Sequence, residues 1–247
     1  MELSHKHSAA ASALQLYAAT LDFQSQLALR WNTRLDPDVP LREQIESVAL
    51  GGEMASLLSI AEAHGPAHLR HEAQRVRESG EDSWRQILNA ALAGHSELAA
   101  SEDFFARGCL QPMAENLQLQ TSRDANYIGS TCPACDGLPQ AAVLRPEGEG
   151  ASRCLVCSFC LCEWPFRRIV CPWCAEEDKE KLPRYSNEQW PHVHVEACDT
   201  CQHYLKAIDL SVDGLAVPLV DEAALAVLDV WATDRGYTKI IRNLIGF

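Results

Sequence analysis

The residues best able to do chemistry in this chain are its cysteines. Of the 11 cysteines, ten lie between Cys132 and Cys201, and only Cys109 lies outside that stretch. Two residues between paired cysteines let one tight turn place both sulfurs on the same side, so that two such turns can supply the corners of a tetrahedral metal site. Four Cys-x-x-Cys pairs therefore predict two complete sites, whose ligands are Cys132, Cys135, Cys157, Cys160, Cys171, Cys174, Cys198 and Cys201.

The pairs recur at a regular interval, which indicates a duplicated unit. The first and third pairs start 39 residues apart, and the second and fourth start 41 residues apart. After the second pair of each unit comes a strand-like segment with an aromatic residue near its start, at 164–169 and at 204–208. Another candidate strand, clearest at 192–195, precedes the last pair. Each unit is thus predicted to contain a cysteine turn, a β-ribbon, a second cysteine turn and a strand.

The same order predicts that each unit closes its own site, the first from the cysteines of 132–160 and the second from those of 171–201. Sequential grouping closes loops of about 20 residues, and interleaved grouping would add only a small entropic cost, so the repeated order is the stronger argument. Units this small cannot fold on apolar burial alone. Zinc bound to short peptides contributes on the order of 10 kcal/mol to folding, so the metal is predicted to be structural.

The remaining polar groups near the pairs are expected to be non-ligands. A redox-active dithiol would normally begin a helix in a βαβ setting, which this region lacks. Cys154 and Cys162 flank the second pair and create a competing Cys154-x-x-Cys157, but the repeat does not include them. Because four cysteines already complete the last site, roles around the ligands or in solvent are expected for His192, His194 and His203. A tetrahedral sulfur set suits zinc and single iron equally.

The chain before the cysteine region has the apolar spacing of helices from about residue 8 to 119, and five or six short helices are expected. Residues 1–125 hold 10 Lys and Arg against 17 Asp and Glu, so this half is interpreted as a scaffold or docking surface. The predicted core stripes are Leu14, Tyr17, Leu21 and Ala28; Leu41, Ile45, Val48 and Ala49; and Trp84, Ile87, Leu88, Ala91 and Leu92. Glycine and proline predict breaks at residues 36–40, 51–52, 65–66, 79–80 and 94.

Some residues of the helical half invite a functional interpretation that we reject. His64, His68 and His71 lack a carboxylate or cysteine at ligand spacing, so they are expected to be solvated helix histidines. Phe104-Phe105 and Cys109 are expected in the core.

The segment after the cysteines is expected to complete the fold. Val220, Ala224, Val227, Leu228 and Trp231 form a helical stripe between Pro218 and Gly236, and the residues beyond it are apolar. The whole pattern predicts an α+β protein, divided into a helical domain at 1–125, metal units at 126–169 and 170–212, and a C-terminal helix with an apolar tail packing on the core at 213–247.

Composition narrows the class of protein. The chain has 247 residues, 47% of them hydrophobic, and a formal net charge of -13, which indicates a soluble globular protein. No run approaches about 18 apolar residues, so no membrane insertion is expected. Only Lys6 precedes the apolar stretch 8–21, which also has helical spacing, so we expect a cytoplasmic location rather than export. Because no phosphate loop, His-Glu-x-x-His or activated nucleophile is found, the chain is expected not to be an enzyme.

The chain resembles the formate dehydrogenase accessory protein family, FdhE. The resemblance extends from Leu110-Gln111-Pro112 to Asn243-Leu244. It depends on the ordered motifs Cys132-Pro133-x-Cys135, Cys157-Ser158-x-Cys160-x-x-Glu163-Trp164, Cys171-x-x-Cys174 and Glu196-x-Cys198-x-x-Cys201-x-x-Tyr204-Leu205-Lys206.

This resemblance implies a helical domain followed by two rubredoxin-like, zinc-ribbon-like units that bind iron at the eight cysteines selected above. It also implies a non-catalytic role in the maturation of a respiratory formate dehydrogenase, through contact with its catalytic subunit. The helical part is shorter than is usual in the family, and Cys154 and Cys162 stand where the family pattern has no cysteine.

Paired cysteine turns are also used by two other classes of protein. A nucleic-acid-binding zinc ribbon needs local positive charge, but residues 127–210 hold 8 Lys and Arg against 12 Asp and Glu. A rubredoxin-like electron carrier acting alone would not need about 120 residues of helices, because a rubredoxin-sized unit suffices. A docking role is the more economical explanation of the helical domain.

Overall fold

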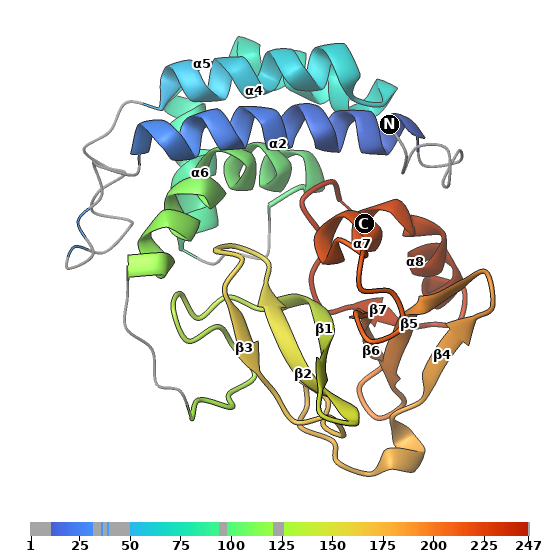
Figure 1. Ribbon diagram of the computed structural model, residues 1–247. Helices are drawn as coiled ribbons and strands as arrows, with labels where there is room; N and C mark the ends of the chain where they lie inside the picture. The colour runs from blue at the N-terminus through green and yellow to red at the C-terminus, as the bar shows by residue number, and fades with distance from the viewer. Residues whose placement is uncertain are drawn as a thin grey trace. The chain divides into compact units, whose positions relative to one another are not determined.

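The computed structural model describes residues 11–31, 36, 39, 50–93, 98–120 and 126–246 (Figure 1). These residues form two compact units. One contains the described residues before 122 together with 244–246, and the other contains 126–243. The first unit is helical and the second combines a mixed sheet with helices, which confirms the predicted α+β class.

The helical unit consists, within the described residues, of α2 (Ala11–Trp31), α4 (Gly51–His64), α5 (Ala67–Leu92) and α6 (Ala100–Gln120). Helix α2 packs along α4 and α6, and α5 packs along α4 and α6 (Figure 1). Large apolar side chains fill the space between them, among them Leu27, Leu57, Phe105, Leu110 and Met113. The helices are longer than the short segments predicted.

The predicted breaks at 65–66 and 79–80 fall where the backbone leaves the helical conformation, whereas Gly51 and Gly52 begin helix α4. Gly65 and Pro66 separate α4 from α5, and the Gly65 amide donates to the Ala61 carbonyl at 2.8 Å. Gly80 has φ 80° and ψ 175° and divides α5 into two helical parts, a conformation that glycine adopts without the steric cost of a Cβ. The predicted stripe at 41–49 and the break at Gly94 lie outside the described residues, as does most of 36–40.

The predicted stripe of α2 is wrong in three of its four members. Tyr17 is buried, whereas Leu14, Leu21 and Ala28 are only partly covered. The buried face includes two polar residues that hydrophobic periodicity cannot identify. Thr20 donates to its own helix at 2.8 Å, and Gln24 donates to the Gly108 carbonyl at 3.3 Å. The full buried set is Leu16, Tyr17, Thr20, Phe23, Gln24, Leu27 and Trp31.

The second unit is built on one sheet with the strand order β3-β2-β1-β6-β5-β4, and β7 pairs with β6. Strands β1 to β3 form an antiparallel half, strands β4 to β6 form another, and parallel pairing of β1 with β6 joins the halves. The strands are β1 (Pro139–Glu147), β2 (Gly150–Cys157), β3 (Glu163–Pro165), β4 (Arg184–Asn187), β5 (Trp190–Cys198), β6 (His203–Asp209) and β7 (Thr238–Lys239), with a 3-10 turn at Lys179–Lys181.

Each half contains the predicted order of cysteine turn, ribbon, cysteine turn and strand. In the first half β1 and β2 form the ribbon and β3 follows the second turn; in the second half β4 and β5 form the ribbon and β6 follows. The predicted strand at 164–169 is too long, because β3 ends at Pro165. Directly after the proline, the Phe166 amide still donates to the Arg153 carbonyl at 2.9 Å.

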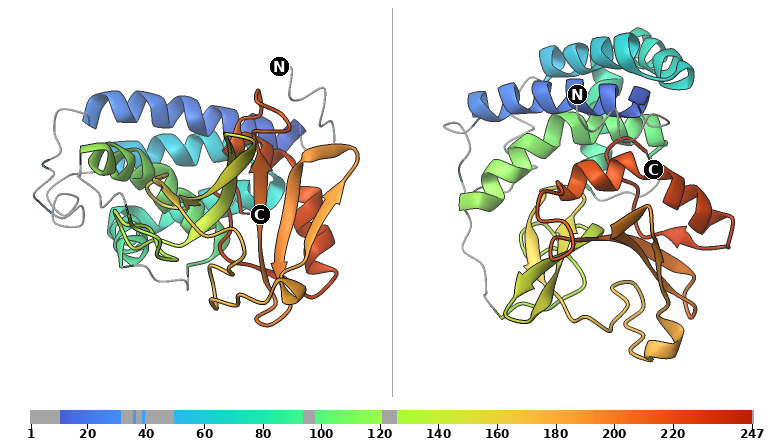
Figure 2. Two further views of the ribbon diagram at one scale, coloured as in Figure 1. Left: turned by 60° about the horizontal axis from the view of Figure 1, so that its bottom comes forward. Right: turned by 45° about the vertical axis from the view of Figure 1, so that its right-hand side comes forward.

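The C-terminal part forms two short helices, α7 (Pro218–Ala224) and α8 (Ala226–Thr233), where one stripe was predicted. Leu225 interrupts them with φ -99° and ψ 43°. Helix α7 contacts β6 and β1, and α8 contacts β7 (Figure 2). Leu228 and Trp231 pack on a cluster around Tyr204, whereas Val227 is exposed. None of the described helices is both long enough and apolar enough to cross a bilayer.

Candidate metal centres

The eight cysteines selected from the sequence come together in two groups. The sulfurs of each group lie within 4.8 Å of one another. The first group joins the cysteine turn before β1 to the turn after β2, and the second joins the turn before β4 to the turn after β5. The sequential grouping predicted from the repeat is therefore the one in the structure. The groups are Cys132, Cys135, Cys157 and Cys160, and Cys171, Cys174, Cys198 and Cys201.

The separations between sulfurs fit a tetrathiolate metal site. The nearest sulfurs are 3.4–3.5 Å apart in the first group and 3.6–3.7 Å apart in the second. Sulfurs joined in a disulfide would be about 2.05 Å apart. Four ligands placed tetrahedrally at about 2.3 Å from one ion would be about 3.8 Å apart. The donor set fits zinc or a single iron ion.

A left-handed residue follows each of the four cysteine pairs. This conformation turns the chain back, and three of these amides donate to the carbonyl of the first cysteine of their pair, at 2.8–3.0 Å. Sequence reasoning missed these positions because glycine usually occupies them. The only signal was their fixed place after each pair. The four residues, with φ between 56° and 59°, are Asp136, Leu161, Ala175 and Gln202.

Backbone amides also point at the sulfurs. In three turns, the amide two residues after the first cysteine donates to that cysteine's sulfur at 3.3–3.4 Å. Such donors favour the charged thiolate, which is the form that binds metal. Burial acts in the opposite direction and raises the pKa of Cys171 to about 11. A bound cation would offset that cost, and its binding would displace protons from the thiols.

Gly137 lies directly against the first sulfur group. A Cβ at this position would be 2.9 Å from the Cys157 sulfur and 3.2 Å from the Cys135 sulfur. Only glycine fits there without displacing a ligand. The second half has Glu176 at the equivalent place, and in both halves the carbonyl of this residue accepts from the first cysteine's amide. Sequence reasoning did not identify Gly137, for which the signal was a glycine two residues after a cysteine pair.

The other cysteines lie outside both groups. Cys154 is half-buried on β2, and burial raises the pKa of its thiol to about 11. Cys162 is buried and directs its sulfur toward the Glu163 carbonyl at 3.8 Å. Cys109 is completely buried in α6, beside the edge-on pair Phe104 and Phe105.

The histidines do not join the sulfurs either. Of the three near the last cysteine pair, only His203 lies at the second group, where its Nδ1 is 2.8 Å from the Cys201 carbonyl. Its ring stacks on Trp173 with centroids 4.3 Å apart. The ring nitrogens of the other two face carboxylates, at 3.6 and 3.8 Å: His192 faces Asp221, and His194 faces Asp209. In the helical unit the side chains at positions 64, 68 and 71 are exposed, as expected.

A buried ion network lies in the same half of the sheet as the second group. Lys206 on β6 is completely buried and contacts Asp229 at 2.5 Å and Glu222 at 3.2 Å. Lys239 on β7 pairs with the same two carboxylates. Tyr204 donates to Asp229 at 2.9 Å. Two lysines thus balance two carboxylates, and the network ties β6 and β7 to α7 and α8.

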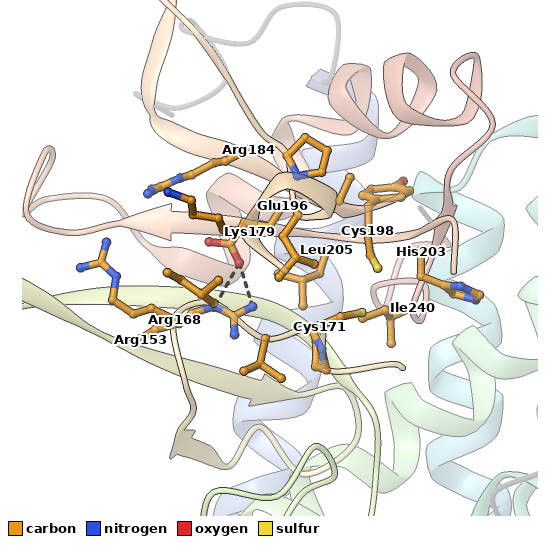
Figure 3. A pocket seen from close by; sticks show the side chains of 17 residues that line it. Arg153, Arg168, Cys171, Lys179, Arg184, Glu196, Cys198, His203, Leu205 and Ile240 are labelled. Atoms are coloured by element: carbon orange, nitrogen blue, oxygen red, sulfur yellow. Dashed lines mark hydrogen bonds and ion pairs between the residues drawn. The ribbon is translucent and has the colours of Figure 1, made fainter. Parts of the chain in front are cut away.

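A cavity of about 280 Å³ adjoins the second sulfur group. Cys171 and Cys198 form part of its wall, and four cationic side chains form another part (Figure 3). Glu196 lies between these parts and accepts from Arg153 at 2.8 and 3.0 Å. We call this cavity the basic pocket. Its cations are Arg153, Arg168, Lys179 and Arg184.

Comparison with known proteins gives consistent results. Residues 131–168 match the sequence model of the FdhE central domain, and residues 169–245 match that of the FdhE C-terminal domain. A "Protein FdhE homolog" of Aquifex aeolicus is 28% identical over 199 residues, which cover 77% of this chain and 68% of that protein. One of Pseudomonas aeruginosa is 35% identical over 119 residues, 46% of this chain but only 38% of that protein.

The fold is similar to a solved structure over nearly its whole length. The crystal structure of the FdhE protein from Pseudomonas aeruginosa aligns with a TM-score of 0.76 and 27% sequence identity. The alignment covers 99% of this chain and 92% of that one. The likeness thus includes the helical unit, which the matches to the two domain models do not reach.

Proposed function

Because this chain belongs to the FdhE family, we propose that it is a non-catalytic accessory protein in the maturation of a respiratory formate dehydrogenase. In this proposal the chain binds the catalytic subunit of that enzyme and works in the cytoplasm, where cysteine thiols stay reduced. The observation that carries the proposal is the pair of four-sulfur groups within the two domains that match FdhE.

Each group would hold one metal ion, and iron is our proposal for both. The ligands would be the eight cysteines of the two groups, whose sulfur separations fit tetrahedral coordination. A bound ion would supply folding free energy to each half and, if it is iron, the capacity for one-electron exchange. The chain's own contribution is to hold the sulfurs through the left-handed turns and the amide donors.

The donor sets support a role without catalysis. Catalytic zinc sites typically have three protein ligands and leave a position for water or substrate, whereas four cysteines complete a tetrahedron. Both groups here have four sulfurs within reach of one ion. In this proposal the metals keep the sheet folded, so that its surface can bind the catalytic subunit. The helical unit contributes a second binding surface for the same subunit.

The test uses the double variant Cys171→Ser with Cys174→Ser, expressed in cells that lack the native protein. Serine hydroxyls stay protonated at neutral pH, so the second site should lose its metal and formate oxidation should fall to the level of the deletion. The matched control is Cys154→Ser, which changes a half-buried cysteine outside both groups. Formate oxidation and the amount of dehydrogenase polypeptide are measured together.

Two outcomes would contradict the proposal at different levels. Normal formate oxidation by the double variant, with the metal demonstrably gone, would reject a functional role for the second site. Normal oxidation in the complete absence of the protein would reject the accessory function itself. Metal analysis and an absorption spectrum of protein purified without air decide between iron, whose thiolate complexes are coloured, and zinc, whose complexes are colourless.

A further inference from the structure

The basic pocket concentrates positive charge in an acidic part of the chain. Residues 127–210 contain 8 Lys and Arg against 12 Asp and Glu, and four of those eight cations line this one cavity. Glu196 is the only carboxylate among the lining residues. Such a concentration, against the net charge of its surroundings, indicates a site for negative charge.

Two of the four cations are available to a ligand. Arg153 is buried and forms an ion pair with Glu196, and Arg184 lies 3.5 Å from Asp209. Arg168 donates to the Ala151 carbonyl, which is uncharged. Within the described part of the chain, neither Arg168 nor Lys179 forms an ion pair with a carboxylate. Both side chains are exposed and can reach an anion at the mouth of the pocket.

The rest of the wall is apolar. Val170 and Ile240 are buried against the pocket, Leu205 lies beneath it, and Ile169 is 53% exposed at its edge. Small inorganic anions are usually held by several converging amide donors or forked arginines. Among the residues that the structure describes, Arg168 is the one lining arginine without a carboxylate partner, and the wall beside it is apolar. A ligand that fills this cavity must carry an apolar group beside its negative charge. In Figure 3 the labelled cations lie on one side of the cavity and the sulfurs of Cys171 and Cys198 on the other.

We propose that the basic pocket binds an acidic segment of a partner polypeptide, with an apolar side chain on the apolar wall and carboxylates against Arg168 and Lys179. The chemical class of the ligand is inferred from the lining residues alone. That the segment belongs to the formate dehydrogenase catalytic subunit rests on the proposed function. Because Cys171 and Cys198 form part of the wall, a bound segment would cover one side of the second metal site.

The test measures peptide binding to the full metal-loaded chain by fluorescence anisotropy. The probe is a fluorescein-labelled peptide of alternating glutamate and leucine; a lysine–leucine and a glutamate–serine peptide are its controls. Arg168→Glu with Lys179→Glu should weaken binding of the glutamate–leucine peptide by more than about tenfold. The matched control, Arg85→Glu with Arg242→Glu, changes the net charge equally at exposed positions outside the pocket and should leave the affinity within about twofold. Ile169→Ala should weaken binding by about fivefold.

Several results would overturn the pocket as a peptide site. These are equal binding of the lysine–leucine peptide, equal binding of the glutamate–serine peptide, unchanged affinity in the Arg168→Glu, Lys179→Glu variant, or displacement of the probe by phosphate or acetate at the probe's own concentration. A bound peptide should also slow release of metal to a chelator, since it covers the second site.

Expression in cells then tests the identity of the partner. If peptide binding is lost in the Arg168→Glu, Lys179→Glu variant, formate oxidation should fall while both metals are retained. Unimpaired oxidation by that variant would overturn the assignment of the segment to the catalytic subunit. Unimpaired oxidation in cells without the protein would instead overturn the proposed function and leave the peptide result standing.

Discussion

The two halves of the sheet share one framework and differ in what surrounds it. Both have two cysteine turns, a left-handed residue after each turn, and a ribbon between the turns. The first half has Gly137 pressed against its sulfurs, whereas the second has Glu176 at that place. Within the described residues, the buried network of Lys206 lies in the second half, and the basic pocket adjoins the second half's sulfurs, with Arg153 and Arg168 of the first half completing its wall.

The features that the two halves share, namely the cysteine turns, the left-handed residues and the ribbons, are the features that metal binding requires. The residue after each cysteine pair has nearly the same φ, 56–59°, at all four turns, as expected where a tetrahedral sulfur set permits little variation. The surroundings are free to change once the framework is fixed. We therefore expect ligand substitutions to affect each half equally, and substitutions in the surroundings to affect one half only.

The largest expected effect comes from removing ligands. Cys132→Ser with Cys135→Ser should lose the first metal, and with it folding free energy on the order of 10 kcal/mol, from the first half alone. The helical unit should keep its circular dichroism signal. Metal analysis should fall from two ions per chain to one, in this variant as in the Cys171→Ser, Cys174→Ser variant. Loss of both ions from either variant would show that the halves fold as one cooperative block.

The next effect is confined to the second half. Lys206→Met leaves two buried carboxylates facing Lys239 alone, and breaking a buried ion pair costs about 3–5 kcal/mol. Chemical denaturation should show this loss in the free energy of unfolding. Lys179→Met, at an exposed lysine, is the control and should change it by less than about 0.5 kcal/mol. A similar small change for Lys206→Met would mean that the network does not support the second half.

A smaller effect is confined to the first half. Gly137→Ala places a methyl group against two ligand sulfurs, and overpacking of this kind costs about 1–3 kcal/mol. Faster release of one of the two metals to a chelator is the expected result. In Gly150→Ala the added carbon would have no neighbour nearer than 3.8 Å, so release should be unchanged. Release of both metals at the faster rate would deny that Gly137 acts on one site.

The smallest effect tests whether the turns are equivalent. A left-handed residue with a Cβ costs about 1–2 kcal/mol, and glycine removes that cost but loses about 0.4–1 kcal/mol through the unfolded state. Ala175→Gly in the second half and Leu161→Gly in the first should each gain about 0.5 kcal/mol by this difference. Melting temperatures measured side by side provide the check. A gain in one half with a loss in the other would show that one of the two side chains packs usefully.

The sequence predicted the features that depend on residues close together in the chain. The cysteine turns, their grouping and the ribbons follow from spacing, since two residues between ligands allow few conformations. The α2 stripe was missed because Thr20 and Gln24 are buried by hydrogen bonds that depend on distant partners. The interruption at Leu225 has no glycine or proline to mark it.

Long-range features had no sequence signal. The pairing of β1 with β6 joins residues more than 60 positions apart. The basic pocket brings Arg153, Arg168 and Lys179 together from three separate segments. The tail is a mixed case: Ile240 and Leu244 are buried, and whether residues beyond Gly236 are needed for the fold stays a prediction.

The parallel pairing of β1 with β6 also determines when the sheet can be completed during synthesis of the chain. During translation the four cysteines of the first group leave the ribosome early and can take up their ion, but β1 cannot pair with β6, which begins at His203, until that strand has been made. Until then β1 has β2 on one side and an open edge on the other, where it is able to pair with a strand of another nascent chain. The rate of translation between Glu147 and His203 therefore sets how long that edge stays open.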